Sequence, residues 1–358
     1  MTAVRSAART PVPPVERPGV LVLRLGPFSH ALHIRRLLVS AAMLALALGL
    51  LTLSLSLGDR VIPPERLLGA FLPDAPRMDR LVVTQWRAPR AVAALVFGAC
   101  LGASGAVFQS LTDNPLGSPD VIGLNTGSFS GVLVVMLLGG TGVGVLAGGA
   151  VAGGLLTAAV VYVLAYRGGL QGFRLIIVGI AVSAVLTSAN TWFSVKSSLD
   201  VSLRAAVWGA GSLTPVRWDS LGMVAAAAAV LFAAMPLLAR WMRALELGDE
   251  AATMLGARVE RAKILLVIVG VALTAIVTAA AGPIAFVSLA APQIARRLRR
   301  TGSFDPAGSA LAGMVLLAAA DAVAVHAIPG AVLPVGSITV CIGGLYLVWL
   351  LLREGRRA

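Results

Sequence analysis

The sequence has few charged residues, few aromatic residues and only two cysteines. Of its 358 residues, 13% are charged and 5% are aromatic, and both Cys100 and Cys341 lie inside apolar stretches. A soluble domain keeps about a quarter of its residues charged, so this composition excludes a soluble globular chain. Cysteines inside apolar stretches behave as small hydrophobic residues, which also excludes a disulfide-built secreted domain.

Motifs for ATP hydrolysis and for nucleophilic catalysis are missing as well. Neither of the two lysines, Lys196 and Lys263, follows a glycine, so the phosphate-binding motif G-x-x-x-x-G-K-[ST] is absent. The pattern G-x-S-x-G is absent too. The histidines His30, His33 and His326 form no metal-ligand pattern with carboxylates or cysteines. We therefore expect no enzyme, no cofactor and no metal site, and any ATP hydrolysis must occur on another chain.

Long apolar runs are abundant in the sequence. Hydrophobic residues make up 58% of the chain, and 39 glycines would let membrane helices pack closely. Apolar runs of about 20 residues are long enough to cross the hydrocarbon core of a bilayer. The sequence therefore predicts an all-α polytopic membrane protein with about ten transmembrane helices, near residues 37–57, 91–110, 119–138, 143–165, 175–195, 219–239, 263–281, 284–298, 308–327 and 334–352.

The net charge of +13 is explained by membrane topology. With a cytoplasmic amino terminus, most of the 29 Lys and Arg residues fall on the cytoplasmic side, as the positive-inside rule requires. This predicts a multi-pass protein of the cytoplasmic membrane with both termini cytoplasmic. The partners expected from charge alone are membrane lipids and not nucleic acid.

Six arginines nevertheless occupy the outer loop between the first two spans. Among them, Arg87 and Arg90 stand three residues apart at the mouth of the second span, beside Trp86. One interpretation is an anchor at the membrane interface. The other is a docking surface for acidic residues of an external partner, because guanidinium groups bind carboxylates in a bidentate manner. Six cations on the disfavoured side favour docking.

Two segments interrupt the apolar runs with helix-breaking residues. The stretch FQSLTDNPLGSPD at 108–120 must turn, and it is either a tight cytoplasmic loop or a constriction in a transport path. The stretch GPIAFVSLAAPQIAR at 282–296 places a proline inside a short span. Asp321 lies near the outer end of the ninth span, where a structural role is expected.

The largest cytoplasmic segment between spans covers residues 240–263. Within it, Asp249 and Glu250 would start a short helix, as the helix dipole favours, and Gly256 would end it. The segment is either a solvated connector or a rigid contact for a cytoplasmic partner.

Seven motifs in this order resemble the permease subunits of iron-siderophore and cobalamin ABC importers, the FecCD or BtuC-like family. They are WRAPR (86–90), SGAVFQSLTDNPLGSPD (104–120), LELGD (245–249) with LG (255–256), GPIAF (282–286), APQIAR (291–296), AD (320–321) and LPVG (333–336). Residues 108–127, 173–177 and 343–346 are most similar to subunits of the ferric-enterobactin type. The resemblance covers a transmembrane permease domain at 37–353, between a basic, flexible cytoplasmic extension at 1–36 and a cytoplasmic tail at 354–358.

The resemblance implies a type II importer fold, in which two permease subunits enclose a path above two ATP-binding subunits. An external substrate-binding lipoprotein would dock from above. By resemblance, the residues with roles are Arg87 and Arg90 for docking, Asn114, Pro115, Leu116, Gly172 and Phe173 for the cytoplasmic gate, and Leu247, Gly248, Asp249, Glu250, Leu255 and Gly256 for the helix coupled to the ATPase.

Several positions depart from the family pattern. Gln293 stands where the family has histidine, Val325 where it has a third docking arginine, and Val332 where it has glutamate. The family's Gly-Ala-Pro near the end is Gly-Gly-Leu at 343–345. Loss of charged residues on the outer face favours a heterodimer with a sister permease over a homodimer.

The expected function is therefore ATP-driven import of an iron(III)–siderophore complex, of the catecholate, enterobactin-like type. Haem, cobalamin or a hydroxamate siderophore are the alternative cargoes within the family. An ion-coupled secondary transporter would need carboxylates near the bilayer midplane, and Asp321 is the one candidate within the interior of a predicted span. A membrane enzyme would need the catalytic residues that are missing.

Overall fold

The computed structural model describes residues 20–25, 28–58, 61–67, 69–72, 75–167, 169–328 and 330–355. Within these residues the regular structure is helical, apart from one antiparallel hairpin of β1 (Val20–Leu25) and β2 (Phe28–His33). The hairpin falls inside the extension that the sequence analysis expects to be flexible. Residues 1–19 of that extension lie outside the described residues.

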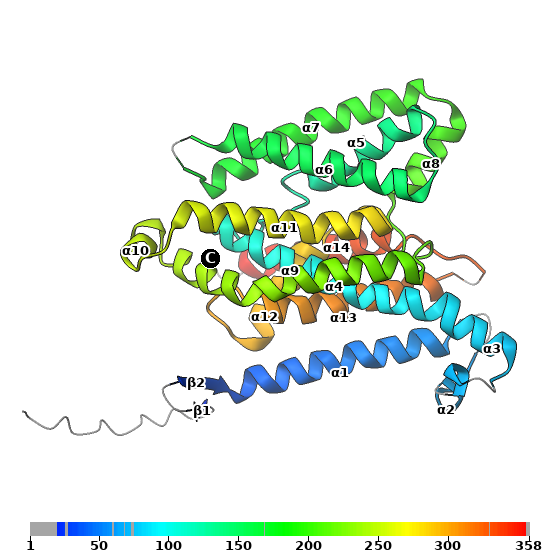
Figure 1. The fold of residues 1–358 in the computed structure, drawn as a ribbon, viewed down its shortest axis with the longest axis horizontal. Helices are drawn as coiled ribbons and strands as arrows, with labels where there is room; N and C mark the ends of the chain where they lie inside the picture. The colour runs from blue at the N-terminus through cyan, green and yellow to red at the C-terminus, as the bar shows by residue number, and fades with distance from the viewer. Residues whose placement is uncertain are drawn as a thin grey trace, which may run out of the picture.

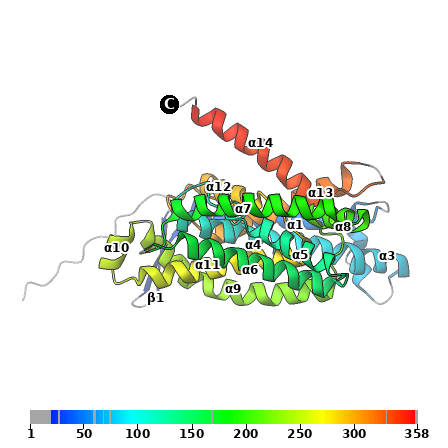
Figure 2. The ribbon, with the colours of Figure 1, turned by 90° about the horizontal axis from the view of Figure 1, so that it is seen from above.

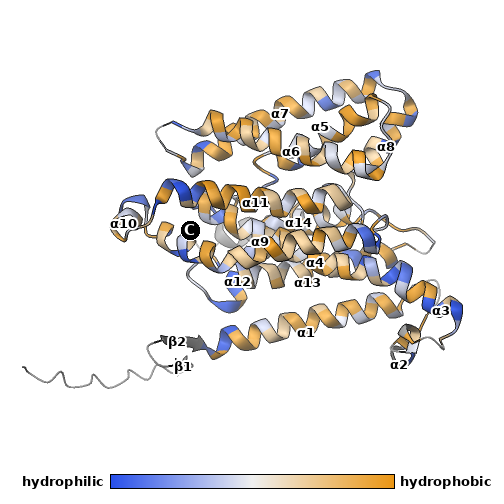
Figure 3. Cartoon of the chain, in the orientation of Figure 1, coloured by the Kyte–Doolittle hydropathy of each residue, from blue (hydrophilic) through white to orange (hydrophobic). Residues whose placement is uncertain are grey.

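Ten helices coincide with the ten predicted spans. Among the described residues, seven helical segments are long and apolar enough to cross a membrane. Helices α5 and α12 and the apolar part of α14, Val335–Tyr346, are shorter. Figure 3 shows apolar residues along the helices and hydrophilic residues gathered at the two ends of the bundle. The ten helices are α1 (Ile34–Ser56), α4 (Ala88–Thr112), α5 (Leu124–Leu137), α6 (Val143–Ala165), α7 (Gly172–Lys196), α9 (Trp218–Leu245), α11 (Val259–Ala281), α12 (Val287–Arg299), α13 (Pro306–His326) and α14 (Val335–Gly355).

Helix α4 forms the centre of the bundle because its glycines let other helices approach closely. A Cβ on Gly98 would collide with the carbonyl of Gly313 in α13, and a Cβ on Gly105 would collide with the carbonyl of Ser288 in α12. Helices α11 and α9 also pack on α4. Helices α5, α6 and α7 form a layer on one side and α1 lies on the other (Figure 1), while α14 leans away from the bundle (Figure 2).

The second span begins earlier than predicted. Helix α3 (Arg77–Leu81), the π-helical segment η2 (Val82–Arg87) and α4 form one continuous helix from residue 77 to residue 112. In the π turn, the Ala88 N–H donates to the carbonyl of Val83, five residues back. Pro89 has no N–H to donate to a helical hydrogen bond. The wider π turn before it lets the helix continue without that bond.

Four short elements were not among the predicted spans. Two lie with α3 at one end of the bundle, α2 (Pro64–Leu67) and the 3₁₀ turn η1 (Gly69–Phe71). Helix α8 (Leu199–Gly209) begins at Ser198, whose hydroxyl accepts a hydrogen bond from the Val201 N–H. Helix α10 (Asp249–Met254) lies at the other end of the bundle, in the cytoplasmic segment where the sequence predicts a short helix.

Candidate functional site

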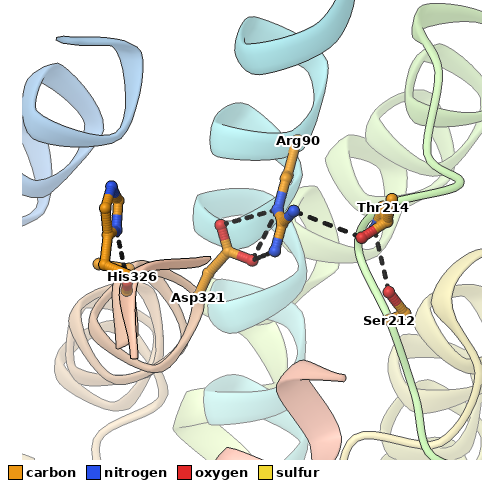
Figure 4. A network of polar contacts seen from close by, with 6 residues as sticks. Arg90, Ser212, Thr214, Asp321 and His326 are labelled. Atoms are coloured by element: carbon orange, nitrogen blue, oxygen red, sulfur yellow. Dashed lines mark hydrogen bonds and ion pairs between the residues drawn. The ribbon is translucent and has the colours of Figure 1, made fainter. Parts of the chain in front are cut away.

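Arg90, in the first turn of α4, forms a bidentate ion pair with Asp321 of α13 (Figure 4). Its Nη2 and Nε lie 2.8 and 2.9 Å from Asp321 Oδ1, and its Nη1 donates to the Thr214 hydroxyl at 3.3 Å. The Asp321 side chain is only 2% exposed. A buried carboxylate without a partner would be costly, so this pair gives Asp321 the structural role expected for it.

Arg87 lies near Arg90 but points to a different helix. Its Nη1 donates to the carbonyls of Leu55 at 2.9 Å and Ser56 at 3.3 Å, which lie at the end of α1 and have no partner within that helix. The structure thus places both predicted docking arginines at the same end of the bundle, with their guanidinium groups turned toward α1 and α13. Their docking role stays a prediction. Other arginines near this end are exposed to solvent, namely Arg66, Arg77, Arg80 and Arg217.

The outer residues that depart from the family pattern lie close to this pair. His326, beside Val325, is exposed, and its Nδ1 lies 2.7 Å from the Ala322 carbonyl of its own helix (Figure 4). Val332 is also exposed. In this chain the outer end of α13 therefore presents no arginine at position 325 and no carboxylate at position 332.

The two predicted gate segments meet at the opposite end of α4. Asn114 Oδ1 accepts a hydrogen bond from the Leu116 N–H at 2.8 Å, which forms an Asx turn directly after α4. Gly172, the first residue of α7, lies against the backbone of Thr112, where a Cβ would collide. The side chains of Leu116 and Phe173 are exposed. The structure therefore brings the start of α7 against the end of α4, two residues before the Asn114 turn.

Gln293 of α12 holds the gate turn from the other side. Its Nε2 donates to the carbonyl of Pro115. One turn earlier on α12, the Leu289 carbonyl accepts a hydrogen bond from Gln109 of α4 at 3.0 Å. A glutamine amide donates a hydrogen bond at any pH, so the replacement of histidine at 293 keeps a donor at the gate and removes a titratable group.

Asp120 joins the starts of two short helices inside the bundle, a role that the sequence analysis missed. Its Oδ2 accepts from the Phe286 N–H at 3.1 Å, just before α12, and its Oδ1 from Asn125 Nδ2 at 2.5 Å, in the first turn of α5. Thr278 of α11 donates to Asn125 Oδ1 at 3.3 Å. Non-helical backbone within a membrane needs such partners. A carboxylate directly before an apolar run was the one available signal.

Helix α10 presents apolar side chains at the end of the bundle that is predicted to be cytoplasmic. Gly248 and Gly256 flank it with φ of 93° and 82°, a left-handed conformation that favours glycine. Leu247, Met254 and Leu255 are strongly exposed, with Met254 at 90%. An exposed apolar patch of this kind is typical of a surface that a partner protein covers.

Lys263 of α11 connects α10 with the gate, a link that was not predicted. Its Nζ lies 2.5 Å from Asp249 Oδ2 in α10 and donates to the Leu170 carbonyl at 2.9 Å. Leu170 precedes Gly172, a predicted gate residue at the start of α7, by two positions. The lysine side chain is only 9% exposed. A buried ammonium therefore joins the candidate coupling helix to the segment that leads into the gate.

Glu246 ties the end of α9 to the loop before α13. Its Oε1 accepts a hydrogen bond from the Phe304 N–H at 2.6 Å. Burial raises the pKa of Glu246 above its usual value, and the hydrogen bond and the nearby Arg296 and Arg243 oppose this effect. The contact fixes α9 and the α12–α13 loop relative to one another beside α10.

Residues 44–353 match the sequence model of the FecCD transport family. The chain belongs to this family. FepG of Escherichia coli K12, the ferric enterobactin transport system permease protein, is 46% identical to it over 321 residues, which cover 90% of this chain and 96% of FepG. FepD of the same strain, also a ferric enterobactin permease, is 32% identical over 92% of this chain and 99% of FepD. The Bacillus subtilis iron(3+)-hydroxamate permease FhuG is 33% identical over 88% of this chain and 97% of FhuG.

A solved structure supports the fold of this FecCD chain. An inward-facing metal-chelate type ABC transporter superposes with a TM-score of 0.78 at 22% identity, covering 88% of this chain and 99% of that chain. At this level of identity the likeness shows the fold alone. Together with the family match, it confirms the predicted permease fold and a multi-pass membrane protein. The same family match favours a transport subunit over a secondary transporter or a membrane enzyme.

Proposed function

We propose that this chain is one permease subunit of an ATP-driven importer that carries a ferric catecholate siderophore, such as ferric enterobactin, across the cytoplasmic membrane. The observation that carries the proposal is the 46% identity to FepG over nearly the whole chain. Identity to the hydroxamate permease FhuG is only 33%. A bulky chelate would pass mainly by size and weak polar contacts, so the path needs no tight iron ligands.

Energy for import comes from two separate ATP-binding subunits at the cytoplasmic end. Helix α10 and its flanks would fit a groove on these subunits through Leu247, Gly248, Asp249, Glu250, Leu255 and Gly256. This assignment is supported by the exposure of Leu247 and Leu255 and by the glycines that set α10 apart from α9 and α11. The contact of Asp249 with Lys263 would carry its movement into the bundle.

The cytoplasmic gate consists of Asn114, Pro115 and Leu116 together with Gly172 and Phe173. The close approach of Gly172 to Thr112 supports this grouping, because it places the start of α7 against the end of the helix that leads into the Asn114 turn. The exposed Leu116 and Phe173 side chains would close the path. ATP binding and hydrolysis shift the population between closed and open arrangements of these segments.

The outer end of the bundle receives the external substrate-binding lipoprotein. Arg87 and Arg90 lie at this end and form the inner part of the docking surface, while the exposed Arg77 and Arg80 form its outer part. A cluster of guanidinium groups suits acidic residues on the lipoprotein. In this orientation both termini of the permease are cytoplasmic.

A sister permease completes the path as a heterodimer. Helix α14 leans away from the rest of the chain (Figure 2) and exposes Leu345, Val348 and Leu352. A second permease subunit would cover this apolar face. The existence of two ferric enterobactin permeases in one organism, FepD and FepG, supports a pair of different chains over a homodimer.

The test is ATP hydrolysis by the purified importer, assembled from this chain, its sister permease and the ATP-binding subunits in proteoliposomes. Binding lipoprotein loaded with a ferric catecholate, a ferric hydroxamate or haem is added in turn. We expect stimulation by the catecholate-loaded protein alone. Equal stimulation by all three would contradict the cargo, and no ATP hydrolysis in the assembled complex would contradict the importer class.

A further inference from the structure

A cavity of about 450 Å³ opens at the cytoplasmic end of the bundle, and its lining includes none of the residues assigned to the gate or to α10. It lies between α1, α9 and the loop that joins α12 to α13. Helix α1 packs on α13 and α12, whereas α9 packs on α11 and α4, so the two helices form opposite walls of a cleft. Its volume is in the range of small-molecule sites.

Three arginines from three different segments line the cavity. Arg36 comes from the start of α1, Arg243 from the end of α9 and Arg299 from the end of α12. Asp305 is the one carboxylate in the lining, and it is already paired with Arg299. Among the described residues, Arg36 and Arg243 form no salt bridge, although the Glu246 carboxylate outside the lining lies near Arg243. The cavity therefore has a net positive charge.

Buried polar atoms in the wall also lack partners. Thr301 is 8% exposed, and its hydroxyl makes no hydrogen bond with a described residue. Nε of Arg299 is buried and unpaired in the same way. Buried donors without partners are uncommon in folded proteins, and these two, one of which belongs to a lining guanidinium group, favour an anionic ligand.

The polarity of the cavity changes with depth in the membrane. The deeper wall is formed by Phe232, Met235 and Pro236 of α9. Phe232 precedes Arg243 by about three helical turns, or about 16 Å along the axis. The site is thus basic at the cytoplasmic interface and apolar toward the bilayer centre. A free phosphate ion would leave the apolar wall uncovered, whereas a phospholipid matches both parts.

We propose that this cavity binds an anionic phospholipid of the inner leaflet. The phosphate lies among Arg36, Arg243 and Arg299 and accepts a hydrogen bond from Thr301, and an acyl chain follows the wall at Phe232 and Met235. Basic pockets between transmembrane helices on the cytoplasmic side are suited to such headgroups. The bound lipid would fix α9, which leads directly into α10, against the α12–α13 loop.

Native mass spectrometry of the purified full chain tests this site, with phosphatidylglycerol and phosphatidylcholine titrated separately. Each arginine near a lipid surface contributes about fivefold in affinity, so the Arg36→Gln/Arg243→Gln variant should bind phosphatidylglycerol about 25-fold more weakly. The matched control is Arg240→Gln/Arg261→Gln, which removes two exposed cytoplasmic arginines outside the cavity. It should bind as the unmodified chain does.

Two further arms separate a built lipid site from general attraction. Ala239→Phe fills part of the apolar wall and keeps all three arginines, and it should also weaken phosphatidylglycerol binding. Inorganic phosphate should not displace the lipid at equal concentration. Equal weakening in both arginine variants, equal affinity for the two lipids, unchanged binding by Ala239→Phe, or displacement by phosphate would each overturn the proposal. Thermal unfolding checks that every variant is folded.

Discussion

The contribution of the Arg90–Asp321 ion pair to the stability of the chain can be tested by substitution. Asp321→Ala leaves a guanidinium group without its carboxylate in a largely buried site. We expect this to lower the free energy of unfolding by about 3–5 kcal/mol. The double variant Arg90→Leu/Asp321→Leu removes both charges and should recover most of this loss. Thermal unfolding of the purified chain measures both. Equal losses in the two variants would mean that the pair does not determine the effect.

The same double variant tests docking separately from folding. Because we expect its fold to be retained, a loss of affinity for the binding lipoprotein reports on the Arg90–Asp321 pair and not on unfolding. We expect the affinity to fall by about tenfold, since charge-assisted hydrogen bonds contribute about 1.5–3 kcal/mol. Arg77→Glu/Arg80→Glu should lower it further, with a strong dependence on salt. Unchanged affinity in both variants would place the docking surface elsewhere.

Gly172 provides a residue-scale test of the gate. Gly172→Ala places a Cβ against the backbone of Thr112, so the start of α7 must move. This should lower the free energy of unfolding by about 1–3 kcal/mol. We expect a severe loss of siderophore uptake. Gly144→Ala, near the start of α6, is the control because nothing lies within 4 Å of its added Cβ. Equal uptake by the two variants would contradict the contact between the gate segments.

The sequence indicated which residues to examine at these sites, but it did not predict the residues that they contact. Motif resemblance selected Arg90, Asn114 and Gly172, and the position of Asp321 within its span indicated a structural role. The pairing of Arg90 with Asp321 could not be predicted, because the residues are 231 positions apart and no local pattern records how α4 packs on α13. The contact of Gln293 with Pro115 was hidden for the same reason.

At the scale of elements, Lys263 connects α10 with α7 and should transmit movement between them. Lys263→Met keeps the length of the side chain and removes the charge that binds Asp249 and the Leu170 carbonyl. We expect ATP hydrolysis by the assembled complex to continue while uptake per ATP falls by about tenfold. Lys196→Met, the other lysine of the chain, is exposed at the end of α7 and should leave this ratio unchanged.

The ratio of uptake to hydrolysis distinguishes coupling from damage. A variant that merely unfolds or fails to assemble would lose both activities together. Retention of the normal ratio in Lys263→Met would contradict the proposed link between α10 and the gate.

Elements were predicted well where hydrophobicity determines them. The ten apolar runs became ten helices, since backbone within a bilayer must satisfy its own hydrogen bonds. The π turn at Val82–Arg87 was missed because it follows from how a helix passes Pro89 and not from composition. Helix α8 was missed because eleven residues are too short to give a membrane signal. The hairpin at 20–33 departs from the expected flexible extension.

At the scale of the whole molecule, we propose that the chain supplies one half of a path and the contacts that move it. One end of the bundle is basic, the other presents α10, and Lys263 joins α10 to Leu170, two residues before the proposed gate residue Gly172. Composition predicted the membrane class, and the order of motifs predicted the family. The cargo could not be inferred from composition, because a weakly polar path carries no ligand pattern specific for one chelate.

Uptake of radioactive iron in a strain that lacks this chain tests the central claim most directly. Iron is supplied as a catecholate, a hydroxamate or haem, with and without depletion of ATP, and the chain is restored as a control. We predict that the deletion abolishes ATP-dependent uptake of the catecholate alone and that restoring the chain recovers it. Undiminished ATP-dependent uptake of the catecholate in the deletion strain would contradict the account.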